Sequence, residues 1–231
     1  MIITIDGPAG SGKSTAARKL AAQLHIPYLD TGAMYRVVGL AAMQDELDLT
    51  DETAITKLAA TADYQLDCGP THVRVVLRGQ DVSEAIRKPE IANHSKEIAK
   101  LRRVREVLVA KQRDIGSELG SMVSEGRDQG SVAFPNADHK FYMIADLQTR
   151  AERRFHELCN EGEDITLDEV IESISSRDES DAKKGGLCRP EDAIEVDTSR
   201  LAMHEVLNKL LTLLADRGVE LPDDFPTKAS S

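Results

Sequence analysis

The sequence predicts an α/β fold in which a parallel sheet forms the core and helices flank it. Short apolar runs alternate with helical patterns along the chain, which is typical of this class. Residues 7–14 read Gly-Pro-Ala-Gly-Ser-Gly-Lys-Ser, the G-x-x-x-x-G-K-[ST] pattern of a phosphate-binding loop. A candidate buried strand, residues 2–6, precedes the motif, and a helical pattern follows it. This order indicates a sheet core of the P-loop NTPase type. The apolar residues at helical spacing are Ala16, Ala17, Leu20, Ala21 and Leu24.

The glycines of this loop allow the backbone to curl so that successive N–H groups point at phosphate oxygens. The N-terminus of the following helix adds partial positive charge. We expect Lys13 to reach the β- and γ-phosphates of ATP and Ser14 to hold Mg²⁺. The residues expected to bind ATP are Gly7, Pro8, Ala9, Gly10, Ser11, Gly12, Lys13, Ser14 and Thr15.

Composition limits the partners of the protein. The chain has 231 residues and a formal net charge of −11. A protein this acidic has no general attraction to nucleic acid or to an anionic membrane. No apolar run is long enough to span a bilayer. A polyanionic ligand at the loop therefore requires that basic residues be concentrated locally.

The cysteines favour a reducing compartment, because Cys68, Cys159 and Cys188 are odd in number and widely separated. The first strand begins at once, with no room for a signal peptide, so we expect a cytoplasmic protein. Cys159 and Cys188 lack the C-x-x-C pairing of a zinc site, and we expect them to be packing residues. We also expect a monomer.

The first half of the chain is predicted to contain a small β insertion. Residues 26–29 are a second candidate strand, 30–32 a turn or cap, and 34–42 a helix. Short strands are then predicted at 64–66, 73–77 and 81–82, separated by glycine-containing turns. These strands form an insertion over residues 62–90 within an otherwise α/β chain.

The second half returns to the α/β pattern. Residues 90–117 are predicted to be helical, and residues 122–124 and 141–144 to be core strands. Helices are expected at 147–160 and 167–183, the second begun by a capping box of Thr166 and Glu169. A last strand at 193–196 and an amphipathic helix at 201–217 follow, with a frayed tail from residue 218.

A candidate lid carries Arg150, Arg153 and Arg154, which a helix would place on one face. The polar segment 160–164 that follows has the composition of a mobile lid tip. One interpretation is a solvated basic face balanced by acidic neighbours. The other is a lid whose arginines clamp a phosphoryl group in transfer, which requires charge neutralisation and positioning.

Other charged residues are candidates for the same site. Gly126-Arg127-Asp128 follows a predicted core strand, and ligands of open α/β sheets bind at the carboxyl ends of strands. Arg177, Asp181 and Lys184 extend the apolar stripe of the 167–183 helix, where a structural ion pair between Arg177 and Asp181 is the alternative. Four further arginines could equally be surface residues: Arg36, Arg102, Arg103 and Arg105.

Taken together, these segments resemble the bacterial-type cytidylate kinase family, nucleoside monophosphate kinases that phosphorylate CMP and dCMP. The resemblance covers nearly the whole chain. Its most specific parts are Gly126-Arg127-Asp128 with Phe134-Pro135, and the stretch 79–87. Further matching segments are 5–15, 29–36, 104–106, 136–137, 177–178 and 197–199. The resemblance implies one kinase domain over 1–221, with a nucleotide-binding region at 31–105, a lid at about 150–185 and a flexible tail at 222–231.

The resemblance also implies roles for individual residues. Thr31 and Arg36 would contact the acceptor nucleotide, and Arg105 and Asp128 would face the cytosine. The phosphate would be bound by Arg127 and the sugar by Arg177 with Asp181. The sequence departs from the family at Lys184, where a phosphate-binding arginine is usual, and at Lys96, where many members have serine. Lys184 keeps the charge but loses the bidentate fork.

The expected reaction transfers the γ-phosphoryl group of ATP to CMP, with Lys13, Arg127, Arg150 and Arg153 as catalytic residues. Two alternatives remain at this point. One is a P-loop kinase for another small acceptor, such as UMP or AMP. The other is a nucleotide-binding switch, although the only Asn-Lys pair, Asn208-Lys209, lies inside a predicted helix rather than in a guanine-binding element.

Overall fold

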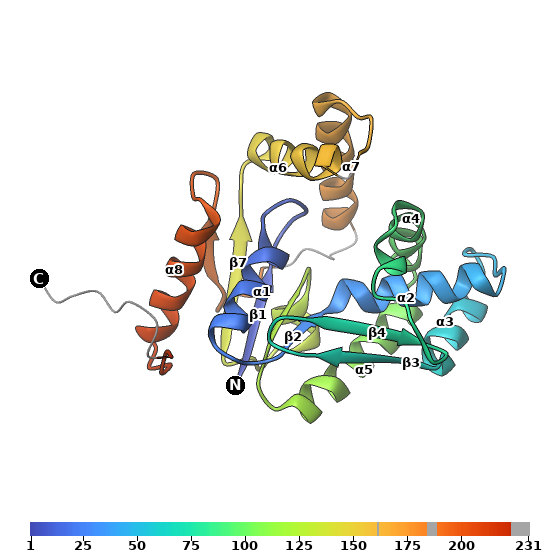
Figure 1. The fold of residues 1–231 in the computed structure, drawn as a ribbon, viewed down its shortest axis with the longest axis horizontal. Helices are drawn as coiled ribbons and strands as arrows, with labels where there is room; N and C mark the ends of the chain where they lie inside the picture. The colour runs from blue at the N-terminus through green and yellow to red at the C-terminus, as the bar shows by residue number, and fades with distance from the viewer. Residues whose placement is uncertain (161, 184–188, 223–231) are drawn as a thin grey trace, which may run out of the picture.

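The computed structural model describes residues 1–160, 162–183 and 189–222 and confirms the predicted fold class. Five parallel strands form the central sheet in the order β2-β6-β1-β7-β8 (Figure 1). Strand β1 pairs with β6 from Ile2 opposite Met122 to Asp6 opposite Gly126. The strand bounds are β1 Ile2–Asp6, β2 Tyr28–Asp30, β6 Met122–Gly126, β7 His139–Ile144 and β8 Ile194–Asp197.

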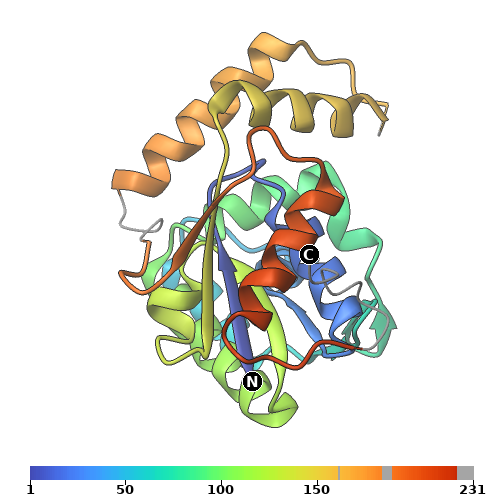
Figure 2. The same ribbon diagram turned by 90° about the vertical axis from the view of Figure 1, so that its left-hand side faces the viewer.

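The alternation of side chains along β1 separates two faces of the sheet. Ile3 and Ile5 are fully buried in a core formed with helices α1 (Lys13–Gln23) and α8 (Met203–Ala215). Ile2 contacts the core on the opposite face, so Thr4 and Asp6 also point to that side. The carboxyl ends of the strands are directed toward the phosphate-binding loop and the lid helices (Figure 2).

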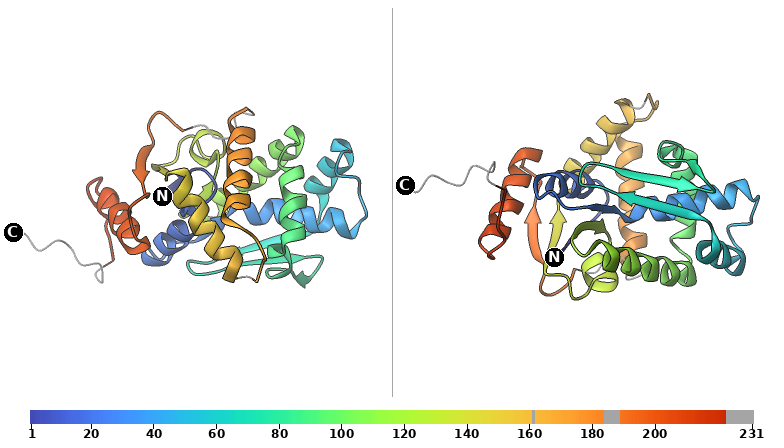
Figure 3. Two further views of the ribbon diagram at one scale, coloured as in Figure 1. Left: turned by 90° about the horizontal axis from the view of Figure 1, so that it is seen from above. Right: turned by 60° about the horizontal axis from the view of Figure 1, so that its bottom comes forward.

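The second core is formed mainly by the helices that follow β2 and precede β6 along the chain. It is built around Met34, Val37, Ile55, Ile98 and Leu108. An antiparallel sheet in the order β3-β4-β5 covers it, as the predicted insertion requires (Figure 3). The elements of this region are α2 Thr31–Gln44, α3 Glu52–Thr61, β3 Tyr64–Cys68, β4 Val73–Leu77, β5 Gln80–Asp81, a 3₁₀ turn Ala85–Arg87, α4 Pro89–Ile98 and α5 Arg102–Leu119.

Three features of this region differ from the sequence predictions. No element is predicted for residues 43–61, where the structure has α3, capped by Asp51. The predicted helical stretch 90–117 is two helices, and the turn between them lets both Ile98 and Val104 reach the same core. Helix α2 begins at Thr31 rather than Met34, because the Asp30 carboxylate caps it by accepting the Ala33 N–H at 3.0 Å.

The lid consists of helices α6 (Leu147–Asn160) and α7 (Leu167–Lys183), which lie above the carboxyl ends of the strands. It has a small apolar cluster of its own, centred on Ala151, Val170 and Ile174. The predicted capping box is confirmed: Thr166 N–H donates to Glu169 Oε2 at 2.8 Å, and Glu169 N–H donates to Thr166 Oγ1 at 3.3 Å. The two helices of the predicted lid therefore have a small apolar core of their own.

Two expectations at the end of the chain differ or fall outside the description. Cys159 is exposed, so the expectation of a packing role is wrong for this residue. It stands near the end of α6, next to Leu158, which packs in the apolar cluster of the two helices while Cys159 faces outward.

Cys188 and residues 223–231 of the predicted tail lie outside the described residues. The prediction of a frayed tail from residue 218 is wrong for its first residues, because the Val219 N–H donates to the Leu214 carbonyl oxygen at 3.1 Å and Val219 and Leu221 pack against the core of α1 and α8. Within the described ranges, none of the helices has the length and apolar character needed to cross a bilayer.

Candidate active site

Residues 7–12 form the turn between β1 and α1, and two glycines make its path possible. A Cβ atom on Gly7 would lie 2.2 Å from the Met143 carbonyl oxygen, so a side chain has no room there. Gly12, with φ at 84°, precedes the first residue of α1, a conformation strained for other residues. The loop thus leads the chain directly into a helix N-terminus, the arrangement that suits a phosphate group.

Lys13, the first residue of α1, has a buried side chain in this loop. Its Nζ atom donates to the Pro8 carbonyl oxygen at 3.3 Å. Burial, together with the positive charge of Arg127, lowers the pKa of Lys13 to about 7. An anion beside the ammonium group would oppose this shift. The side chain is therefore placed to gain charge when phosphate binds.

Glu125 is a buried acidic residue at the end of β6, and the sequence analysis does not single it out. Ser14 Oγ donates to Glu125 Oε1 at 2.9 Å, and the Tyr28 hydroxyl donates to the same atom at 3.4 Å. A carboxylate beside a hydroxyl is a set of hard oxygen donors that suits a divalent cation. The signal in the sequence is an acidic residue at the end of the apolar run 122–123, just before Gly126.

Asp128 and Arg105 form an ion pair beyond the end of β6. Arg105 Nη2 lies 2.5 Å from Asp128 Oδ2, and Asp128 is 8% exposed. The Arg105 guanidinium also donates to the hydroxyl oxygen of Tyr35. Burial, with Asp128 close by, raises the pKa of Tyr35, so its hydroxyl is neutral. The structure thus brings Arg105 from α5, Tyr35 from α2 and Asp128 from the loop to one place.

Arg127, the residue before Asp128, points toward the phosphate-binding loop. Its Nη1 atom donates to the Gly7 carbonyl oxygen at 3.0 Å. Its charge also contributes to the lowered pKa of Lys13. Arg127, after the end of β6, and Gly7, after the end of the neighbouring strand β1, therefore meet where the phosphate-binding loop begins.

Thr31 and Arg36 occupy the first two turns of α2, at the carboxyl end of β2. Thr31 Oγ1 donates to the Glu125 carbonyl oxygen at 2.8 Å, which joins α2 to β6. Arg36 Nη2 donates to Asp30 Oδ2 at 2.8 Å, while the other oxygen of Asp30 caps the helix. Arg36 is therefore held at the helix start by a carboxylate that sequence reasoning did not select.

The lid arginines Arg150 and Arg153 both hydrogen-bond to the protein itself. Arg150 is buried, donates to the carbonyl oxygens of Ala145 at 3.0 Å and Ala9 at 3.1 Å, and pairs with Asp178 at 2.7 Å. Arg153 donates to Thr198 Oγ1 at 3.1 Å and to its carbonyl oxygen at 2.6 Å. These bonds attach the lid to the phosphate-binding loop and to the segment after β8. The predicted contact of both residues with a phosphoryl group stays a prediction.

Arg154, the third lid arginine, pairs with Glu157 at 3.0 Å on the lid surface, as the solvated-face interpretation expects. Its charge nevertheless reaches across the site. Burial is the main cause of the lowered pKa of Lys96 in α4, and Arg177 and Arg154 add to it. Arg177 also contributes to the lowered pKa of Lys13. Positive charge therefore gathers between the lid, α4 and the phosphate-binding loop.

Two predicted residues of α7 and its continuation cannot be placed. Asp181 lies in the last turns of α7, and its side chain falls outside the described part of the structure. Lys184 lies outside the described residues altogether. Arg102 and Arg103 belong to the first turn of α5, and Arg102 pairs at the surface with Glu106 at 2.9 Å.

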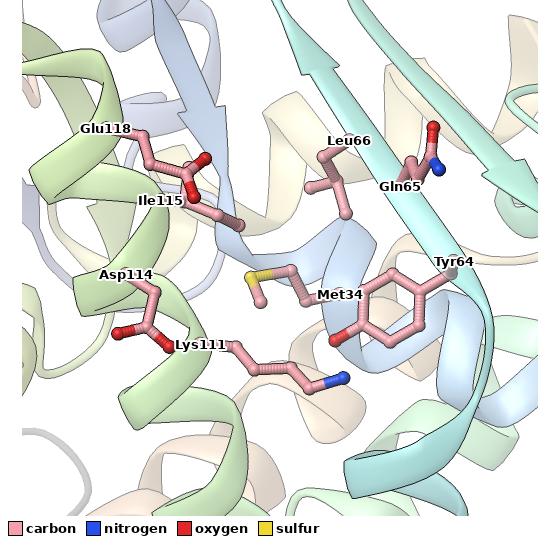
Figure 4. A pocket seen from close by; sticks show the side chains of 8 residues that line it. All are labelled: Met34, Tyr64, Gln65, Leu66, Lys111, Asp114, Ile115 and Glu118. Carbon is pink, nitrogen blue, oxygen red and sulfur yellow. The ribbon is translucent and has the colours of Figure 1, made fainter.

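A pocket of about 320 Å³ is lined by none of the predicted site residues. It is formed by α2, α5 and β3, with Lys111 Nζ 4.6 Å from the centre of the Tyr64 ring. Figure 4 shows the side chains of Met34 and Leu66 between α5 and the ring of Tyr64. The predicted chemistry instead gathers at the carboxyl ends of β1, β2 and β6, where phosphate-binding backbone, cations and a buried carboxylate meet.

Known proteins resemble this chain in fold. A protein from Eubacterium ventriosum has a TM-score of 0.53 at 12% identity, covering 94% of this chain and 99% of that structure. TT1252 from Thermus thermophilus has a TM-score of 0.50 at 18% identity, covering 95% and 98%. At these identities the likeness concerns the fold alone.

Sequence comparison is more specific. A cytidylate kinase from Caldanaerobacter subterraneus subsp. tengcongensis is 45% identical over 210 residues, covering 90% of this chain and 92% of the relative. A cytidylate kinase from Bacillus subtilis is 42% identical over 211 residues, covering 90% and 94%. A model of the cytidylate kinase family matches residues 3–216. With this match over nearly its whole length and the phosphate-binding loop in place, the chain belongs to the cytidylate kinase family.

Proposed function

We propose that the protein transfers the γ-phosphoryl group of ATP to CMP and dCMP, giving ADP and CDP or dCDP. The names of its relatives and its family support the reaction class. The single observation that carries the choice of acceptor is the ion pair of the buried Asp128 with the partly buried Arg105 at 2.5 Å. It offers both an acceptor and a donor at the carboxyl ends of the strands.

The acceptor base is read by this pair. An ionised carboxylate only accepts hydrogen bonds, so Asp128 suits the exocyclic amine of cytosine. Uracil presents a carbonyl oxygen at the same position, and two facing acceptors repel each other. Burying such a mismatch costs a few kcal/mol, so CMP is preferred over UMP by roughly tenfold to a hundredfold or more.

ATP is bound by the loop Gly7–Thr15, with Lys13 directed at the β- and γ-phosphates. The donor set of Ser14 Oγ and the Glu125 carboxylate fits Mg²⁺, which prefers few carboxylates plus substrate phosphates. When bound, Mg²⁺ would neutralise phosphate charge. The protein's own contribution is the ammonium of Lys13, whose lowered pKa returns toward its ordinary value beside phosphate.

The acceptor phosphate is held by arginines from three elements. Arg36 from α2, Arg127 from the loop after β6 and Arg177 from α7 would surround this phosphate, and the charges of Arg127 and Arg177 already lower the pKa of Lys13. Thr31 contacts the nucleotide, Asp181 and Arg177 hold its sugar, and Lys184 contacts its phosphate. Arg127 supplies charge next to the donor loop through its contact with Gly7.

The attacking group is a phosphate oxygen of CMP. The second pKa of a phosphate monoester is about 6, so this oxygen is largely ionised at neutral pH and needs no strong general base. Catalysis rests on positioning and on charge neutralisation by Lys13 and the arginines. Closure of the lid excludes water that would otherwise accept the phosphoryl group, and it brings Arg150 and Arg153 to the transferring group.

The test is the variant Asp128→Asn, with Asp114→Asn on exposed α5 as the control for loss of a carboxylate. The amide offers a donor as well as an acceptor, so the ratio of kcat/KM for CMP to that for UMP should fall about tenfold or more. The control should keep the wild-type ratio. An unchanged ratio in Asp128→Asn would contradict the assignment of the base site. We also propose that the protein is a monomer, for which light scattering should give the mass of one chain, 25.3 kDa.

A further inference from the structure

The loop that carries Arg127 and Asp128 is anchored by a residue outside the proposed binding set. Asp6, the last residue of β1, is 1% exposed. Its Oδ1 atom accepts the Gln129 N–H at 2.8 Å, and its Oδ2 atom accepts the Gly130 N–H at 2.7 Å. Both acceptor atoms of one buried carboxylate are thus used on consecutive peptide groups of this loop.

On the other side of Asp128, the loop is held by Gly7, the residue after Asp6. The Gly7 carbonyl oxygen accepts from Arg127 Nη1 at 3.0 Å. Asp6 and Gly7, at the junction of β1 and the phosphate-binding loop, therefore contact the residues on both sides of Asp128. The loop also packs closely against β1, because a Cβ atom on Gly130 would lie 2.9 Å from Thr4 Oγ1.

The position of Asp128 depends on these anchored peptide groups. Residues Gln129–Ala133 form a π-helical turn, and the Asp128 carbonyl oxygen accepts the N–H groups of Val132 at 2.8 Å and Ala133 at 3.1 Å. Turns of this kind are uncommon and occur often at functional sites. A shift of the 129–130 backbone would therefore move Asp128 relative to Arg105.

We propose that Asp6 is a positioning residue for base selectivity: its carboxylate fixes the 129–130 backbone so that Asp128 stays where it reads the acceptor base. The inference rests on the proposed function. A carboxylate accepts two N–H groups at once, whereas an amide of the same shape directs its own N–H₂ at one of them. Asp6 immediately precedes the ATP-binding loop, but both of its side-chain hydrogen bonds are directed at the 129–130 backbone.

A purely structural role for Asp6 would lower stability without changing the choice of base. The experiment therefore compares Asp6→Asn with Ile3→Val, which lies on the same strand but packs into the α1–α8 core on the opposite face of the sheet. Loss of one methylene group from this core lowers stability at a place away from the 129–130 backbone. For each folded variant, kcat and KM are measured for CMP, UMP and ATP.

We expect Asp6→Asn to lower the CMP to UMP ratio of kcat/KM by about tenfold, mainly through a higher KM for CMP. The KM for ATP should stay within about threefold, and Ile3→Val should keep the wild-type ratio. If Asp6→Asn does not fold, Asp6→Ser, which leaves room for a water molecule, is held to the same criterion.

A folded variant with the wild-type ratio would overturn the inference and leave the proposed function intact. A wild-type protein without preference for CMP would overturn the proposed function and this inference with it.

Discussion

Lys13 shows how one side chain can combine burial with anion binding. An ammonium group loses hydration when it is buried, and Arg127 adds repulsion, so the pKa of Lys13 falls to about 7. The folded protein then binds fewer protons at this site than the unfolded chain between pH 7 and 10.5, so its contribution to the free energy of unfolding rises with pH across that window. A bound phosphate should raise the pKa of Lys13 again, so that Lys13 takes up a proton.

We therefore expect proton uptake when the protein binds ATP at pH 8. Uptake of up to about one proton should appear at pH 8 and decline toward pH 6, where Lys13 is already charged. Isothermal titration in buffers of different ionisation enthalpy measures this uptake. The variant Lys13→Arg keeps the charge at both pH values and should take up no proton. Uptake that is equal in both proteins would contradict the lowered pKa.

Glu125 illustrates what a single sequence conceals at the scale of one residue. The loop Gly7–Ser14 is predictable because several residues with fixed spacing share one function. A lone glutamate at the end of a strand has no such pattern, and its partner Ser14 is far away in the sequence. Asp6 escapes notice for the same reason, since its role depends on which main-chain N–H groups the fold brings to it.

Replacing Glu125 tests its proposed role beside the cation. In Glu125→Gln one hard, charged ligand becomes a weak one, so the Mg²⁺ concentration for half-maximal turnover should rise by about tenfold or more. Titration of Mg²⁺ at fixed ATP measures the change. Glu118→Gln, an exposed change on α5, is the matched control and should titrate like the wild type. A wild-type Mg²⁺ dependence in Glu125→Gln would refute the assignment.

At the scale of elements, strands and helices with strong apolar patterns are predicted well. Strand β1, the insertion strands and helix α7 with its capping box are confirmed within a few residues. Helix α3 was missed because it presents only a few apolar residues, Ile55, Leu58 and Ala59, to the core. The turn between α4 and α5 contains no glycine that would have indicated a helix end. It lets both helices pack into one core, which is a tertiary effect.

The lid arginines were predicted to lie on one face, yet the structure gives them separate partners. Arg150 is buried against the phosphate-binding loop and Asp178, whereas Arg154 pairs with Glu157 at the surface. The spacing i, i+3, i+4 indicates a shared helix face, but it cannot tell which guanidinium meets main-chain oxygens from another segment.

This difference predicts unequal costs of substitution in the lid. Arg150→Met leaves Asp178 and two carbonyl oxygens without their donor, and we expect a loss of about 2–4 kcal/mol in the free energy of unfolding. Arg154→Met removes an exposed pair and should cost at most about 0.5 kcal/mol. Urea unfolding of both variants measures these values. Equal costs would contradict the structural placement of Arg150.

At the scale of the whole molecule, the site gathers positive charge although the chain as a whole is strongly acidic. The chain carries a net charge of −11, yet Lys13, Arg127 and Arg177 are close enough for the two arginines to lower the pKa of Lys13. Such focusing attracts small polyanions without a general affinity for nucleic acid. The composition excluded a basic surface, but only the fold shows that residues more than 100 positions apart share one site.

The most direct test of the central claim is to offer the enzyme a panel of nucleoside monophosphates and to measure the ADP released from ATP with each. The account predicts saturable use of CMP and dCMP, with kcat/KM for CMP at least about tenfold above that for UMP, AMP or GMP. Binding of ATP without saturable use of CMP would contradict it, as would equal or better use of UMP or AMP. A preference for GTP over ATP would favour a nucleotide-binding switch instead.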